Sequence, residues 1–328
     1  MSTNLFQTVE EALYKSSQVR TKIDPKLVPK YYFPYLDDVL FGIAPAELVV
    51  IGADTGQGKS WLANNLAINN AKHGRKSYLF SLEGHRNEVI NRIKWGIILR
   101  EYYKNPTYKD MTYAKYEMNM IEGLEEFEKI AEEEIKDMVG DKLMLFDKSQ
   151  SLNINILTQQ LGLIADAELV VIDHLHYFDM VDDTNEAQHL SEILKRVKFI
   201  TEERNIPVVM ISHLRKKHGQ RGLPDNEDFM GTSNIPKIAT TCIILSSNPE
   251  KHNLADGKYS TIVRVTKSRA GASTTLAAEL TFDSKLQTYE ENFSLGKVLS
   301  GSYKDLTEDE QPYWAKAKNN KTFWSDDD

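Results

Sequence analysis

The chain has 328 residues, of which 41% are hydrophobic and 27% are charged, so it can hold one large α/β domain or two small ones. No apolar run approaches the roughly 18 residues of a membrane span, and the acidic N-terminus lacks the apolar stretch of a signal peptide. A single cysteine, Cys242, fits a reducing cytoplasm, and a net charge of −8 argues against general attraction to nucleic acid, so any such contact must rest on particular loops.

Residues 1 to about 25 predict a lone amphipathic helix. Its apolar residues recur at helical spacing: Leu5, Val9, Ala12 and Leu13. Pro25 and Pro29 break this pattern, and the aromatic stretch 31–36 is expected to be irregular. The helix either folds back on its own core or docks on a neighbouring subunit, and the residues alone favour neither.

The next segment, residues 46–70, dominates the sequence. An apolar run at 48–51 predicts a buried strand, and it is followed by a glycine-rich turn, Lys59, Ser60 and apolar positions at helical spacing. This order is typical of a phosphate-binding loop, although Ala53 stands where the strict pattern has its first glycine. The predicted nucleotide-binding residues of this loop are Gly52, Ala53, Asp54, Thr55, Gly56, Gln57, Gly58, Lys59 and Ser60.

Each part of the loop suits phosphate chemistry. Backbone N–H groups and the positive end of the helix dipole would bind phosphate oxygens. Lys59 would reach the β- and γ-phosphates, and the Ser60 hydroxyl would bind Mg²⁺.

Polar residues end three later apolar strands. A strand at 77–80 leads to Glu83, which would either activate a water molecule or begin the next helix. The strand at 169–172 ends in Asp173, which suits the Mg²⁺ hydration shell. The strand within 206–211 leads to His213, which the residues alone favour as a structural hydrogen-bond partner.

The rest of the chain alternates helices and strands. Residues 85–140 predict a solvated helical layer without chemistry, and residues 215–234 form a long loop that is basic at its start. Further strands are expected at 142–147, 238–245, 259–266 and 276–282. From residue 292 the periodicity is lost, which predicts a flexible acidic tail or an acidic-aromatic docking peptide.

Five segments in this order resemble the RecA-type core of replicative ring helicases, the DnaB family and the helicase half of phage and mitochondrial primase-helicases. They lie within about residues 40–290 and read GADTGQGKS, YLFSLEG, VVIDHLHYF, VVMISHLRKK and VTKSRAG. The resemblance implies that Glu83 is the catalytic base and that His213 senses the γ-phosphate. It also implies that Arg269, with Lys267 beside it, acts as a finger on a neighbouring subunit's ATP. The catalytic residues expected are Lys59, Glu83, His213, Lys267 and Arg269.

The same resemblance implies an overall organisation. The fold would be α/β, a RecA-like P-loop ATPase core with a mainly parallel sheet flanked by helices. Residues 1–30 would form a linker helix that docks on the next subunit, 31–291 the ATPase domain and 292–328 the tail. The ligands would be ATP or another nucleoside triphosphate with Mg²⁺, and a hexameric ring would encircle single-stranded DNA.

Two departures from the family concern partners. The expected DNA segment lacks the family's arginine. Contact with DNA would come from Gly231, Thr232, Ser233 and Asn234, or from Arg215, Lys216 and Lys217. The last three residues equally suit the solvated base of a loop. No primase or collar domain is expected ahead of the core, so priming would come from another chain or be absent. The tail is a candidate site for a primase or polymerase. The Asp-His pair of VVIDHLHYF and the compact length favour a phage-encoded protein acting in the host cytoplasm.

The function predicted from the sequence is therefore an ATP-dependent replicative DNA helicase. The alternatives are a RecA-like recombinase or regulatory ATPase, and a helicase accessory protein that uses nucleotide as a switch. The Lys267–Arg269 element and the FSLE segment argue against the recombinase.

Overall fold

The computed structural model describes residues 8–9, 28–54, 56–82, 86–104, 111–146, 152–179, 185–215, 222–248, 251–252, 255–272 and 275–318. Almost all of the predicted N-terminal helix lies outside these residues, and so do Thr55, Glu83, Lys216, Lys217 and the end of the tail. None of the described helices is both long and apolar enough to cross a membrane.

Ten strands of the described chain form one sheet, in the order β10-β9-β8-β7-β6-β1-β5-β4-β2-β3. The parallel strands are β1 (Leu48–Ala53), β2 (Ser77–Ser81), β3 (Leu143–Leu145), β4 (Leu169–Asp173), β5 (Val208–His213) and β6 (Thr241–Ser247). The antiparallel strands are β7 (Lys258–Ser268), β8 (Leu276–Asp283), β9 (Thr288–Leu299) and β10 (Ser302–Asp305). The mainly parallel centre matches the expected α/β fold.

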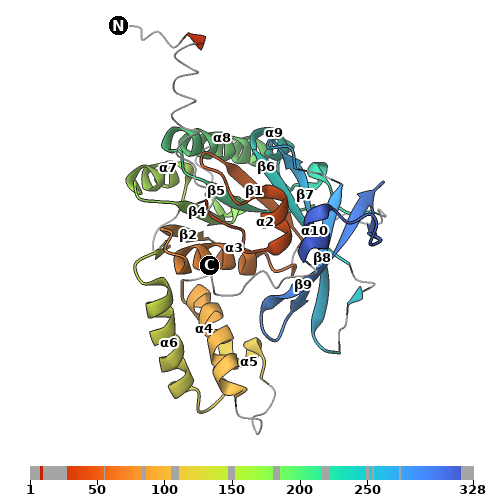
Figure 1. Ribbon diagram of the computed structural model, residues 1–328. Helices are drawn as coiled ribbons and strands as arrows, with labels where there is room; N and C mark the ends of the chain where they lie inside the picture. Colours follow the sequence, from red (N-terminus) through yellow and green to blue (C-terminus); the bar gives the residue numbers. More distant parts are fainter. Residues whose placement is uncertain are drawn as a thin grey trace.

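Both faces of the sheet are covered by helices. Because side chains alternate along a strand, Val49 and Ile51 of β1 face one core, which α2 (Pro34–Leu40) and α3 (Lys59–Lys72) complete. Val50 faces the other core, formed with α7 (Ile154–Leu163), α8 (Glu186–Arg204) and α9 (Ile235–Ile238), which lie along the top of Figure 1. Burial on both faces explains the continuous apolar runs of the parallel strands.

Three helices extend away from the sheet in the lower part of Figure 1: α4 (Arg86–Tyr102), α5 (Tyr113–Glu117) and α6 (Glu125–Val139). They pack around a core of their own, in which Trp95 is fully buried and stacks on Tyr116 with ring centroids 5.2 Å apart. The Trp95 indole N–H donates to the Lys285 carbonyl at 2.7 Å. The expectation of a merely solvated layer was therefore wrong.

The sheet also continues past the boundary predicted at residue 291. β9 crosses it, β10 pairs with β9, and α10 (Tyr313–Lys318) follows. Leu295 and Val298 are buried, so the prediction of a flexible tail from residue 292 was wrong for 292–318. The stretch 31–36 differs as well, because α2 begins at Pro34 with its aromatic residues in the core.

Candidate nucleotide-binding site

The carboxyl ends of four adjacent parallel strands meet at one edge of the sheet. The strands are neighbours in the order β1-β5-β4-β2. Ala53 at the end of β1 pairs with His213 at the end of β5, and Asp173 at the end of β4 pairs with Ser81 at the end of β2. The register thus brings the predicted residues side by side, at the edge where ligands of open α/β sheets bind.

The phosphate loop joins β1 to α3. Gly56 and Gly58 have φ values of +83° and +69°, which favour glycine, and α3 begins directly afterwards at Lys59. Gly52 serves a different purpose, because a Cβ there would lie 2.6 Å from the Phe229 ring. The loop is anchored from β9, where the Tyr289 hydroxyl donates to the Gln57 carbonyl at 3.0 Å.

Lys59 is buried and directed at His213. Its Nζ lies 2.9 Å from His213 Nδ1 and 3.3 Å from the carbonyl oxygens of Ala53 and Asp54. Because an ammonium group only donates, Nδ1 accepts, and the neutral His213 ring carries its hydrogen on Nε2. Burial first, then the charge of Lys59, lowers the pKa of His213 to about 4, which agrees with a neutral ring.

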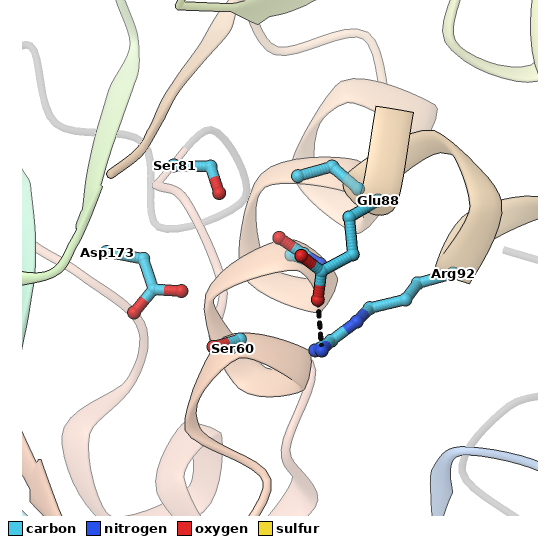
Figure 2. Close-up of a pocket in the computed structure, with 7 residues that line it drawn as sticks. Ser60, Ser81, Glu88, Arg92 and Asp173 are labelled. Atoms are coloured by element: carbon cyan, nitrogen blue, oxygen red, sulfur yellow. Dashed lines mark hydrogen bonds and ion pairs between the residues drawn. The ribbon is translucent and has the colours of Figure 1, made fainter. Parts of the chain in front are cut away.

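A cavity of about 290 Å³ opens beside the loop, and Figure 2 shows its lining. The residues around it are Ser60, Asn64, Ser81, Glu88, Val89, Arg92 and Asp173. The Asp173 carboxylate, on a residue only 1% exposed, and the Ser60 hydroxyl approach the cavity from the sheet and α3, opposite α4. A carboxylate and a hydroxyl are hard oxygen donors that suit Mg²⁺ together with phosphate oxygens. The described residues contain no group of three or more His, Cys, Asp or Glu side chains arranged for a metal.

The Lys267–Arg269 element lies at the other edge of the sheet. Ser268 of β7 pairs with Thr241, and Thr241 pairs with Val49 at the amino end of β1. Ala53 is four residue steps along β1 from Val49, so this edge is roughly 13 Å from the phosphate loop. Arg269 is exposed there and is not part of the cavity of its own chain.

Lys267 makes contacts within its own chain. Its ammonium donates to the carbonyl of Ala239 at 2.6 Å and to that of Pro236, at the carbonyl end of α9. Burial is the main cause that lowers its pKa. A cation at this helix end is stabilising, so Lys267 bonds the end of α9 in its own chain and does not reach the cavity.

The predicted DNA segment packs on α8. Thr232 is buried with its hydroxyl 2.9 Å from that of Ser191, and the Asn234 amide donates to the same oxygen at 3.0 Å. Ser233 and Arg215 are exposed. A groove of about 750 Å³ beside them is lined by α8 and the loop: Asn185, Ala187, Gln188, Ser191, Glu192, Lys195, Arg215, Gly231, Thr232, Ser233 and Asn234.

Residues 30–291 match the model of the DnaB-like helicase C terminal domain family. The chain belongs to this family. The replicative DNA helicase DnaB of Leifsonia xyli is 25% identical over 259 residues, which cover 74% of this chain and 52% of that protein. Among solved structures, an isolated ATPase domain aligns with a TM-score of 0.70 and 18% identity, covering 87% of this chain and 98% of that one. A DnaB-like replicative helicase, described with its interactions with primase, aligns with a TM-score of 0.67 and 17% identity, covering 88% and 68%.

These matches confirm the DnaB resemblance and the RecA-like α/β fold. Membership of a DnaB-like ATPase family also implies a nucleotide site. The chain spans about half the length of the curated relatives that it matches.

Sequence reasoning missed two charged residues that line this cavity. Glu88 and Arg92 lie one turn apart on α4, where Glu88 Oε1 accepts from the Arg92 guanidinium at 2.6 Å (Figure 2). The available signal was an acid and a base at i and i+4 in the first turns of a helix that begins at the edge of the site. Their position makes α4 one side of the cavity.

Proposed function

We propose that this DnaB-like chain is an ATP-dependent replicative DNA helicase, which assembles as a hexameric ring and translocates on single-stranded DNA. The observation that carries the proposal is the division of the site between two edges of the sheet. Lys59, Ser60, Asp173 and His213 surround or adjoin the phosphate cavity, whereas Arg269 is exposed at the opposite edge. An arginine there is suited to another subunit's nucleotide.

Nucleotide would be bound by the loop and the first turn of α3. Backbone N–H groups of residues 52–58 would donate to phosphate oxygens, and Lys59 would leave His213 for the β- and γ-phosphates. Ser60 and Asp173 would hold Mg²⁺, which when bound neutralises charge on the phosphates. His213 would then contact the γ-phosphate side of the site.

Hydrolysis needs a base for the attacking water. We assign this role to Glu83, which follows Ser81 at the end of β2 by two positions and lies outside the described residues. Its carboxylate would accept the water's proton while Arg269 of the neighbouring subunit stabilises the transition-state charge. Glu83→Gln should bind ATP normally and lose hydrolysis stimulated by single-stranded DNA. Unchanged hydrolysis would contradict the assignment.

The assembled state is testable by subunit mixing. Lys59→Ala and Arg269→Ala should each lose unwinding of a forked duplex with ATP. In mixtures, some interfaces join an intact loop to an intact arginine, so ATPase activity should return if Arg269 acts in trans. Electron microscopy with an ATP analogue and an oligonucleotide separates closed rings from the filaments of a recombinase.

DNA would lie along the groove beside α8. The exposed groups available there are Arg215, Ser233 and the backbone at Gly231, together with Lys216 and Lys217 outside the described residues. Contacts of this kind bind phosphates without reading sequence. The DnaB-like helicase described with primase supports a primase as a partner of this chain as well. Deleting residues 319–328 and measuring primase binding tests whether the tail takes part.

A further inference from the structure

Three histidines lie together behind the phosphate loop. His174 follows β4, His176 lies in the short helix η1 (Leu175–Tyr177), and His213 ends β5. The rings of His174 and His213 have centroids 4.2 Å apart, and those of His176 and His213 are 5.5 Å apart. The proposed hydrolysis uses only His213, which leaves the role of His176 open.

His176 and His213 contact the backbone of the same residue of the candidate DNA segment, Met230. The Met230 N–H donates to the His213 carbonyl at 2.9 Å, and the Met230 carbonyl lies 3.2 Å from His176 Nε2. Because a carbonyl only accepts, the hydrogen of His176 is on Nε2. Burial lowers the pKa of His176, which favours the neutral ring, and a neutral ring has a single N–H donor.

The residues after Met230 have little freedom to move independently. Gly231 has a φ of +86°, and a Cβ there would lie 2.2 Å from a Leu190 methyl group of α8. Thr232 and Asn234 both bond the Ser191 hydroxyl. A displacement of the Met230 carbonyl would therefore be carried to the whole segment 230–234 and to its contact with α8.

We propose that His176 is a positioning residue that couples the phosphate site to segment 230–234 by holding the Met230 carbonyl. The inference rests on the proposed function, in which phosphate draws Lys59 away from His213. That exchange changes the hydrogen-bonding partner of the His213 ring, which lies against the His176 ring. His213 also ends β5, where its carbonyl accepts from the Met230 N–H. Nucleotide at the phosphate site and DNA at the groove beside α8 would then shift the same conformational equilibrium, that of segment 230–234.

The test is the coupling between the two ligands. The dissociation constant of an oligo-dT strand is measured with and without a non-hydrolysable ATP analogue, and their ratio is the coupling factor. By thermodynamic reciprocity, the strand must change the affinity for the analogue by the same factor, which is typically about 5–150-fold. Both measurements are made on the full chain with Mg²⁺.

Four variants separate positioning from packing. His176→Gln keeps an N–H donor at the reach of Nε2, whereas His176→Asn is too short and His176→Leu has no donor. The matched control is His252→Leu, which removes a histidine whose Nε2 also lies 3.3 Å from a carbonyl, that of Ser260. Circular dichroism melting checks that each variant is folded. If His176→Leu is not folded, the comparison rests on His176→Gln and His176→Asn.

We expect the coupling factor to fall below about twofold in His176→Asn and His176→Leu, with the affinity for the analogue alone within about twofold of wild type. His176→Gln and His252→Leu should keep the wild-type factor. Wild-type coupling in His176→Asn, or equal loss in His176→Gln, would overturn the role of His176 while leaving the proposed function intact. A wild-type chain that binds neither ligand, or shows no coupling, would overturn the proposed function and this inference with it.

Discussion

Replacing Gly231 by alanine combines two costs that can be calculated separately. At a φ of +86° a Cβ is disfavoured by about 1 kcal/mol. The new carbon would also lie 2.2 Å from Leu190 Cδ1, whereas carbon atoms pack at about 3.5–4 Å. Forcing more than 1 Å of movement on a buried leucine costs about 1–3 kcal/mol, so Gly231→Ala should lose about 2–4 kcal/mol of unfolding free energy.

Gly74 provides a matched control. Its φ is +80°, and nothing lies within 4 Å of a Cβ built there, so Gly74→Ala should lose only the backbone contribution of about 1 kcal/mol. Urea unfolding followed by circular dichroism compares the midpoints at constant slope. In the double variant with Leu190→Ala the steric cost should vanish, which a double-mutant cycle would reveal. Equal losses for Gly231→Ala and Gly74→Ala would refute the close approach of Gly231 to Leu190.

Three further predictions address the site itself. Lys267→Met should lower the unfolding free energy by about 1–3 kcal/mol, because two carbonyls lose a charged donor. In the same urea titration, Arg269→Ala should change it by no more than about 0.5 kcal/mol, because Arg269 is exposed. Similar losses in the two variants would contradict the bonds from Lys267 to α9. Removing the positive charge in Lys59→Met should raise the pKa of His213 from about 4 toward its ordinary value, since a cation disfavours the imidazolium, and an unchanged NMR titration would contradict the pairing. Arg92→Met should weaken binding of a fluorescent ATP analogue by roughly tenfold, because its guanidinium lines the cavity and is suited to pair with phosphate oxygens, and unaltered affinity would exclude that contact.

The part of the site that was predictable is the part encoded locally. A phosphate loop between a strand and a helix needs only adjacent residues, and Asp173 stands out because it ends an apolar run. His213 also follows an apolar run, but its functional role came from the family resemblance. Parallel strands then bring such ends to one edge, so the grouping followed from the fold class before any pairing was known.

The remaining contacts depend on partners far along the chain. Lys267 bonds a carbonyl 28 positions away, and Thr232 meets Ser191 across 41 positions, so their inward orientation has no local signature. The flexible tail predicted from residue 292 was wrong up to residue 318 for a related reason. Polar residues hide the alternation of β9, and its burial comes from pairing with β8 and β10.

The bond between Trp95 and the Lys285 carbonyl has a mechanical consequence for the nucleotide cavity. Lys285 lies in the turn between β8 and β9, and β9 carries Tyr289, which anchors the phosphate loop at Gln57. Trp95 is about one helical turn from Arg92. The β8–β9 hairpin therefore connects the phosphate loop to α4 through two hydrogen bonds, so a shift of the hairpin would be passed to both of them.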